Sequence, residues 1–232
     1  MHRTLDVVTS LAASVARLGG GLRSGHRGER PDKLLELYEF EACPYCRKVR
    51  EALSILDLEA IIYPCPRGGS RFRKVVEARG GKLLFPYLVD PNTDVAMYES
   101  NDIVAYLFRV YGDGEVPLHL RLGPLTNATA MMASALRPGF GAFARPSRAP
   151  EQPLELWSFE ASPFCRIVRE VLSSLEIPYR LHNVAKGSPS RQAFLARSGK
   201  MQVPFLHDPN TGADMFESAD IADYLRRTYE IR

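Results

Sequence analysis

The chain contains one stretch of sequence twice, and this internal repeat limits its fold more than any other feature. Residues 37–47 (LYEFEACPYCR) recur as residues 156–166 (LWSFEASPFCR), and residues 85–93 recur as residues 203–211. Each copy lies in its own half of the 232-residue chain, and each half is long enough to bury a core. The repeat therefore predicts two structural copies of one unit rather than a single large domain.

Each copy is predicted to consist of a short helix, a basic connector and a folded module. The expected domains are residues 1–33 (helix and connector), 34–114 (first module), 115–152 (linker with a short helix) and 153–232 (second module). Apolar residues spaced for one helical face predict the two short helices. They are Leu5, Val8, Ala12, Val15 and Leu18 in the first copy, and Leu125, Met132 and Leu136 in the second.

Within the first module, strand-forming runs alternate with helical faces in the order βαβαββα. A strand over residues 34–40 ends at a cysteine pair, and Pro44 opens a helix because proline in the first turn loses no hydrogen bond. Ser100 is expected to cap the last helix with its hydroxyl. The remaining elements are expected at residues 60–63 (strand), 68–78 (helix), 85–90 and 95–98 (hairpin strands) and 102–111 (helix).

Composition places the chain among soluble globular proteins. Hydrophobic residues make up 45% and charged residues 25%, and no apolar run is long enough to span a membrane. No secretion signal is recognised at the N-terminus, and four cysteines do not form a disulfide framework in a chain of this length. We therefore expect a reducing compartment, the cytoplasm or the stroma of an organelle.

The net charge of +3 is concentrated in the flanking segments. Residues 1–30 hold five arginines against two acidic residues, and residues 117–150 hold four arginines and no acidic residue. Basic flanks attract membrane surfaces and nucleic acids, but solvated arginines beside a folded module need no partner. We expect no nucleic-acid partner and no transmembrane segment.

Cys43 and Cys46 are the strongest candidates for chemistry. A cysteine just ahead of a helix has its thiolate favoured by the helix dipole and the free amides, and Cys43 is that residue. Cys46, one turn further on, is placed to attack a mixed disulfide at Cys43, and Arg47 and Lys48 add positive charge. The alternatives are inert thiols or half of a zinc site. Zinc needs two further ligands that neither copy offers at suitable spacing, so no metal is expected.

The second copy carries Ser162 in place of Cys43, and Cys165 in place of Cys46. Because serine forms no disulfide, this copy cannot run the same dithiol cycle. It is either a binding module or one kept for structure and pairing. Cys65 has no counterpart in the second copy and is expected to be a buried thiol without a role.

The element order, the Cys-Pro-Tyr-Cys motif at residues 43–46 and a proline opening the third strand resemble the thioredoxin fold. More narrowly, residues 34–112 and 153–230 resemble glutaredoxins and the N-terminal, glutathione-binding domain of glutathione transferases. The resemblance implies an α/β chain of two tandem thioredoxin-like domains, each with a mixed four-stranded sheet. Its specific parts are the cysteine motif and the pairs Phe85-Pro86, Val203-Pro204, Glu99-Ser100 and Glu217-Ser218.

The resemblance also implies a glutathione site in each copy. Pro86 and Pro204 are expected to follow cis peptide bonds that turn the preceding backbone toward the site, the alternative being trans prolines at an edge strand. The acidic-serine pairs are expected to hold the γ-glutamyl group at a helix N-terminus, with plain capping as the alternative. The implied glutathione-binding residues are Tyr45, Lys82, Phe85, Pro86, Glu99, Ser100, Gln202, Val203, Pro204, Glu217 and Ser218.

The two copies depart from the family pattern in opposite ways. Gln202 stands where the family places a side chain for the glycyl carboxylate, whereas the first copy has Leu84 there, with Lys82 and Lys200 as substitutes. The first copy thus has the better nucleophile but fewer side chains suited to binding glutathione, and the second copy has the reverse. One hypothesis is that the two sites have different roles in one function.

The function that these features favour is that of a glutathione-dependent thiol-disulfide oxidoreductase, acting on protein or glutathione mixed disulfides with glutathione as cosubstrate. It requires Cys43 to be reachable and to face Pro86. The alternatives are glutathione binding without redox turnover, a glutathione transferase, and iron–sulfur binding at Cys43. A transferase is disfavoured because, in that family, an all-helical domain builds the pocket for the electrophile. Residues 117–150 are too short and too rich in glycine and proline to replace such a domain. The sequence leaves open whether the two domains pair with each other or the chain forms a homodimer.

Overall fold

A computed structural model of the chain describes residues 7–12, 19–25, 27–121, 131, 137 and 139–231. Residues 7–12 are helical, which agrees with the helix expected around Val8 and Ala12. The other positions used to predict the two short helices, Leu5, Val15, Leu18, Leu125, Met132 and Leu136, lie outside the described residues.

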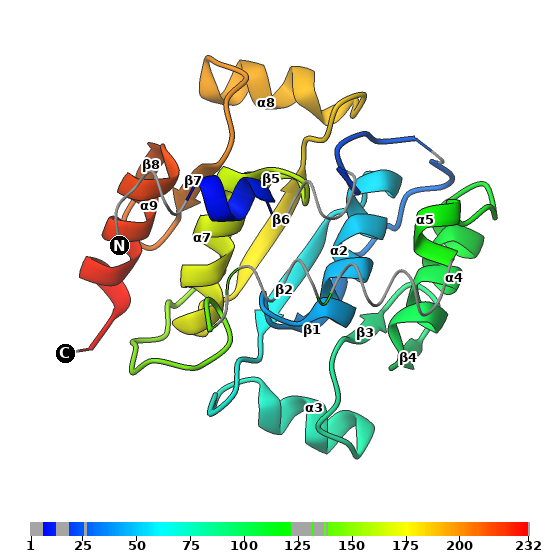
Figure 1. Ribbon diagram of the computed structural model, residues 1–232, viewed down its shortest axis with the longest axis horizontal. Helices are drawn as coiled ribbons and strands as arrows, with labels where there is room; N and C mark the ends of the chain where they lie inside the picture. Colours follow the sequence, from blue (N-terminus) through cyan, green and yellow to red (C-terminus); the bar gives the residue numbers. More distant parts are fainter. Residues whose placement is uncertain are drawn as a thin grey trace.

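The first module has the predicted order βαβαββα (Figure 1). Its first helix begins at Pro44, and its second is capped at the C-terminus by Gly81, whose φ of 74° suits a glycine in the left-handed region. The elements are β1 (Leu35–Glu39), α2 (Pro44–Leu56), β2 (Ala60–Pro64), α3 (Arg73–Gly80), β3 (Tyr87–Asp90), β4 (Val95–Met97) and α4 (Ser100–Tyr111).

The second module repeats this order, as the internal repeat predicts. A short helix that the sequence did not predict, α5 (Leu118–Arg121), follows the first module. The elements of the second module are β5 (Leu154–Ser158), α7 (Pro163–Ser174), β6 (Tyr179–Asn183), α8 (Ser190–Ser198), β7 (Phe205–Asp208), β8 (Ala213–Phe216) and α9 (Ser218–Tyr229).

The two modules share one sheet. Among the described residues, eight strands lie in the order β4-β3-β1-β2-β6-β5-β7-β8, and β2 and β6 pair antiparallel at the centre. Their register places Ala60 opposite Leu181 and Ile62 opposite Tyr179. The sheet therefore consists of two mixed four-stranded halves, β4-β3-β1-β2 and β6-β5-β7-β8. An approximate two-fold axis between β2 and β6 relates them. The domains of the chain therefore pair with each other, one of the two outcomes that the sequence left open.

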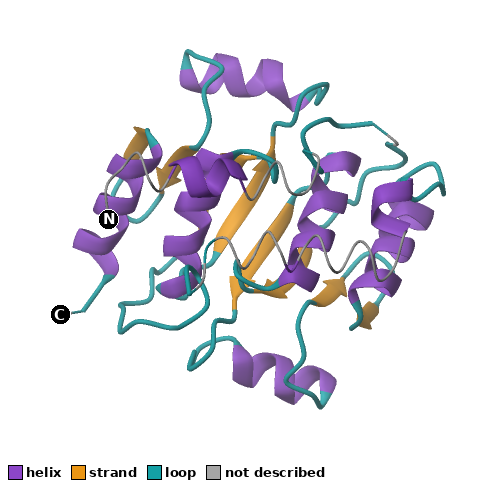
Figure 2. Ribbon diagram, in the orientation of Figure 1, coloured by secondary structure: helices purple, strands orange, loops and turns teal. Residues whose placement is uncertain are grey.

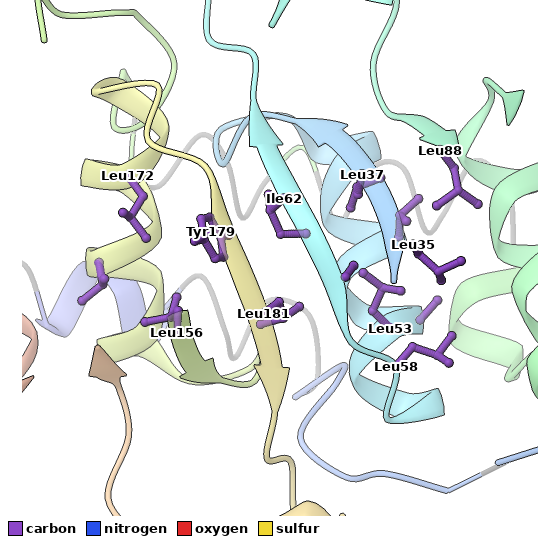
Figure 3. Close-up of a cluster of buried hydrophobic side chains, with 14 of the residues drawn as sticks. Leu35, Leu37, Leu53, Leu58, Ile62, Leu88, Leu156, Leu172, Tyr179 and Leu181 are labelled. Atoms are coloured by element: carbon purple, nitrogen blue, oxygen red, sulfur yellow. The ribbon is translucent and has the colours of Figure 1, made fainter. Parts of the chain in front are cut away.

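The main apolar core lies on one face of this sheet and runs through both modules. Leu35 and Leu37 of β1 belong to it, whereas Tyr38 points to the opposite face and packs with Val76 of α3. Figure 2 shows the central strands flanked by helices, and Figure 3 shows Ile62 and Tyr179 on the two strands that meet at the junction. The core is continuous across the junction, so neither module buries its surface alone.

The structure corrects two predicted helix starts. Helix α3 begins at Arg73 and not at Gly68. Before it, the Gly69 amide donates to the Pro66 carbonyl at 3.0 Å and closes a turn. The next two amides, of Ser70 and Arg71, donate to the Glu176 carboxylate of the second module at 3.1 Å. A local sequence pattern contains no information about a partner more than 100 residues away.

The last helix of the first module starts at Ser100, two residues earlier than expected, and that of the second module starts at Ser218. The N-cap residues are Glu99 and Glu217, and neither helix has a side-chain capping bond. The prediction that the serine hydroxyls cap these helices is therefore wrong. No helix within the described part of the chain is both long enough and apolar enough to cross a bilayer.

Candidate active site

Cys43 is the N-cap residue of α2, with φ −74° and ψ 120°. Its sulfur accepts a hydrogen bond from the Cys46 amide, with N and Sγ 3.3 Å apart. The same sulfur lies 4.0 Å from the carbonyl oxygen of Phe85. The Phe85-Pro86 and Val203-Pro204 bonds are both cis, as predicted. The structure thus brings the helix start, the two cysteines and the backbone before Pro86 together.

The two thiols of this site differ in acidity. Burial acts to raise the pKa of Cys43, but hydrogen bonds from the Cys46 thiol and amide and from the Tyr45 amide outweigh it, and the pKa lies below the usual cysteine value. Burial raises the pKa of Cys46 well above that value, and the bond to Cys43 raises it further. Cys43 is therefore the better nucleophile, and Cys46 stays protonated until a partner removes its proton.

Access to Cys43 is narrower than the sequence led us to expect. Only 4% of its surface is exposed, whereas 44% of the neighbouring Tyr45 is exposed. Of the two conditions set by the sequence, proximity to the backbone before Pro86 is met. Ready access is not, because almost all of the Cys43 surface is covered by neighbouring residues.

In the second module, Ser162 takes the place of Cys43 as the N-cap residue of α7. Its Oγ accepts a hydrogen bond from the Cys165 amide at 3.2 Å. Burial raises the pKa of Cys165, whose side chain is fully enclosed. The same geometry therefore holds a hydroxyl where the first module holds the Cys43 thiol.

Five predicted residues of the second module gather around a small cavity of about 140 Å³. Within it, the Gln202 amide donates a hydrogen bond to the Glu217 carboxylate. Lys200 does not line this cavity and has its Nζ 4.0 Å from the centre of the Phe216 ring. Of the two side chains considered for the glycyl carboxylate, only that of Gln202 lines the cavity. The cavity is lined by Phe164, Gln202, Val203, Pro204, Glu217 and Ser218.

Glu99 and Glu217 share an uncommon backbone conformation just before the last helix of each module. Their φ angles are 65° and 66°, in a region that non-glycine residues seldom adopt. Such strain persists where the surrounding structure requires it, often at binding sites. In the first module, Lys82 and Leu84 are exposed and Ser100 is buried beside Glu99.

Sequence reasoning missed a cluster of buried charges between the modules. Arg50 binds Glu39 of its own module and also Glu160 of the second, with Nε 3.0 Å from Oε2. Arg169 makes the matching contact in the other direction, with Nε 3.0 Å from Glu41 Oε2. The signal was present, because both copies contain a glutamate two residues before the N-cap and an arginine in the helix. The ion-paired cluster comprises Glu39, Glu41, Arg47, Arg50, Glu160, Arg166 and Arg169.

The structure places three basic residues differently from what the sequence suggested. Arg47 is buried and lies 4.0 Å from Glu160, and Lys48 is buried and donates to the side chain of Asn101. Neither is among the main influences on the pKa of Cys43, although the sequence suggested that both add positive charge beside this thiol. Arg137 of the linker, expected to be solvated, is also buried and pairs with Glu170 at 2.5 Å.

A larger cavity of about 790 Å³ lies along α7 and α9, against residues 139–145. Ser218 borders both this cavity and the smaller one. The basic side chains in its wall contact acidic side chains of the same wall: Arg137 with Glu170, Arg145 with Glu230, and Arg226 with Asp223. Among the described residues, no group of three or more His, Cys, Asp or Glu side chains is placed to hold a metal ion.

Comparison with known proteins identifies the module. The family model of the N-terminal domain of glutathione S-transferase matches residues 37–115 and again residues 156–232. No curated protein and no solved structure matches the chain significantly. The two matched stretches coincide with the two modules and cover more than half of the chain. The chain therefore belongs to the family of the glutathione S-transferase N-terminal domain, which it contains twice.

Proposed function

We propose that this protein is a glutathione-dependent thiol-disulfide oxidoreductase in which Cys43 is the nucleophile. The observation that carries the proposal is the position of Cys43 at the N-cap of α2, with Cys46 one turn further on. The family of the module points to glutathione as the thiol that the site accepts. Free thiols at all four cysteines suit a reducing compartment such as the cytoplasm.

In the proposed reaction, the Cys43 thiolate attacks one sulfur of a mixed disulfide between glutathione and a second thiol. The S–S bond of the substrate breaks, and one thiol leaves and takes a proton from solvent. Cys46 loses its proton to solvent and attacks the Cys43 sulfur, so that the second thiol leaves and a Cys43–Cys46 disulfide forms. Two glutathione molecules then reduce this disulfide and become glutathione disulfide, which balances the electrons.

The limited exposure of Cys43 adds a step before the chemistry. With 4% of the residue exposed, a substrate sulfur reaches Sγ only after the rim has moved. Tyr45 and Leu84 near the site are 44% and 48% exposed, and we infer that their side chains form the part of the rim that moves. We therefore propose that opening of this rim, rather than sulfur exchange, limits turnover.

The test is reduction of a glutathione mixed disulfide of a small thiol by glutathione, followed through the glutathione disulfide formed. Cys43→Ser should abolish turnover because the other three cysteines are fully enclosed and cannot replace it. Cys65→Ala, a change at a buried cysteine outside the site, should leave the rate unchanged. Turnover that survives Cys43→Ser would reject the proposed nucleophile.

A second candidate, glutathione binding without redox turnover, is favoured by the cavity of the second module. Five of its six lining residues are those that the family resemblance assigns to glutathione, and Ser162 offers a hydroxyl in place of a thiol. Calorimetry with glutathione on the Cys43→Ser variant separates the two. Binding without any turnover in the unmodified protein would favour this candidate.

A further inference from the structure

The turn that carries Cys43 is bound from outside its own module. Glu41 lies two residues before Cys43, and its backbone N–H donates to Ser173 Oγ at 3.2 Å. Its carboxylate accepts from Arg169, with Nε 3.0 Å from Oε2. Ser173 and Arg169 both belong to α7 of the second module. The second module thus binds both the amide and the side chain of Glu41.

Little chain separates this anchor from the reactive sulfur. Only Ala42 lies between Glu41 and Cys43, and the Cys43 amide donates to the Phe40 carbonyl at 3.0 Å, which closes the turn. Glu41 is buried, so its bonds are shielded from water. A shift of Glu41 therefore moves Cys43 relative to the amides at the start of α2, on which the acidity of its thiol depends.

The reciprocal contacts provide an internal comparison. The Glu160 amide donates to Ser54 Oγ at 3.0 Å, and Arg50 of α2 binds the Glu160 carboxylate. Glu160 lies two residues before Ser162, as Glu41 lies two residues before Cys43. Each module therefore anchors the N-cap turn of the other, but only one of the two turns carries a thiol.

We propose that α7 of the second module is a positioning element for Cys43, acting through Ser173 and Arg169 on Glu41. The inference rests on the proposed function, because it concerns the thiol that performs that reaction. It gives the second module a part in the chemistry although its own N-cap residue is a serine. The first module does not keep its active geometry by its own contacts alone.

Two matched substitutions test the proposal in the full-length chain. Ser173→Ala removes the acceptor of the Glu41 amide, and Ser54→Ala removes the acceptor of the Glu160 amide. Each leaves one buried N–H without its partner. Ser173→Ala also removes the hydroxyl that donates to the Gly141 carbonyl at 2.8 Å, so it should destabilise the fold at least as much as Ser54→Ala. The readout is the midpoint of the pH dependence of Cys43 alkylation by iodoacetamide, with the modified cysteine identified by peptide mass. This midpoint reports the acidity of the thiol and is independent of how fast the rim opens.

We expect Ser173→Ala to raise this midpoint by about half a pH unit or more, because the thiolate loses part of its hydrogen bonding. Ser54→Ala should leave the midpoint unchanged, and Ser173→Thr, which keeps the hydroxyl, should restore it. If Ser173→Ala does not fold, Ser173→Cys keeps the volume with a weaker acceptor and carries the same expectation.

An unchanged midpoint in Ser173→Ala would overturn the proposal, and so would equal shifts in both alanine variants, which would indicate general loosening. Alkylation needs neither glutathione nor a disulfide, so this experiment remains interpretable if the oxidoreductase assay fails. Conversely, if the wild-type protein turns over as proposed and Ser173→Ala leaves the alkylation midpoint unchanged, the positioning role is rejected and the proposed function is retained.

Discussion

Arg50 and Glu160 form a buried ion pair between the two modules, with Nε of the first residue 3.0 Å from Oε2 of the second. The guanidinium also binds Glu39, and the carboxylate also binds Arg169. Charges withdrawn from water are tolerated only when they are well paired. The junction is therefore specified by charge as well as by apolar contact.

Replacement of Glu160 by glutamine should destabilise the protein strongly. The variant leaves Arg50 and Arg169 buried with too little negative charge, and removal of one partner from a buried pair costs about 3–5 kcal/mol. The measurement is the free energy of unfolding in urea. Asp223→Asn, which breaks the exposed pair with Arg226, is the matched control and should cost less than about 1 kcal/mol. Equal losses in the two variants would contradict the assigned role of the cluster.

Glu39 should make stability depend on pH between about 4.5 and 7. Burial raises the pKa of Glu39 to about 7, against the opposing effect of Arg50. The folded state therefore binds a proton more tightly than the unfolded chain, so this contribution is present below pH 4.5 and is lost as the pH rises to about 7. In the Glu39→Gln variant this loss is absent.

The stability of wild type and Glu39→Gln should therefore be compared at pH 5 and pH 8. Between these values the difference should shift in favour of the variant, by on the order of 1–3 kcal/mol. The absence of a shift would mean that Glu39 is ionised throughout this range in the folded protein.

Alkylation should modify the cysteines in a fixed order. Cys43 retains a small exposed surface and has a lowered pKa, whereas Cys46, Cys65 and Cys165 are enclosed and their pKa values are raised. At pH 7 one equivalent of iodoacetamide should label Cys43 first, as peptide mass spectrometry would show. Labelling of Cys65 or Cys165 ahead of Cys43 would refute the assigned difference in reactivity.

Gln202→Leu should weaken glutathione binding by the second module by about tenfold, because it removes one polar contact to a charged ligand. The change copies Leu84 of the first module and removes the partner of Glu217. Calorimetry in a Cys43→Ser background measures the effect. The reverse change, Leu84→Gln, should leave that affinity as it is. An unaltered affinity in Gln202→Leu would exclude this residue from the site.

Local features of the fold could be predicted from the sequence because their causes are local. Pro44 and the residue before it define a helix start, so the N-cap position of Cys43 followed directly. The repeat gave the order of elements in both modules. The cis bonds before Pro86 and Pro204 followed from the family resemblance.

Features that depend on the contact between modules could not be predicted. The arginines of α2 and α7 have the spacing of a solvated charged face, and Arg50 and Arg169 each have one acidic partner more than 100 positions away. The turn before α3 is fixed by Glu176 in the other module. Burial of Cys43 and pairing of β2 with β6 likewise depend on the three-dimensional arrangement, which a local pattern does not contain.

Antiparallel pairing of β2 with β6 joins two halves that belong to one polypeptide. A dimer of separate subunits with the same junction would fall apart on dilution, whereas covalent linkage keeps the effective concentration of each half constant. The outer strands of the sheet are then β4 and β8, which are only three and four residues long and offer little backbone for other chains to join. Fusion thus makes pairing of the two halves independent of the protein concentration. The short outer strands limit edge-to-edge aggregation of the sheet.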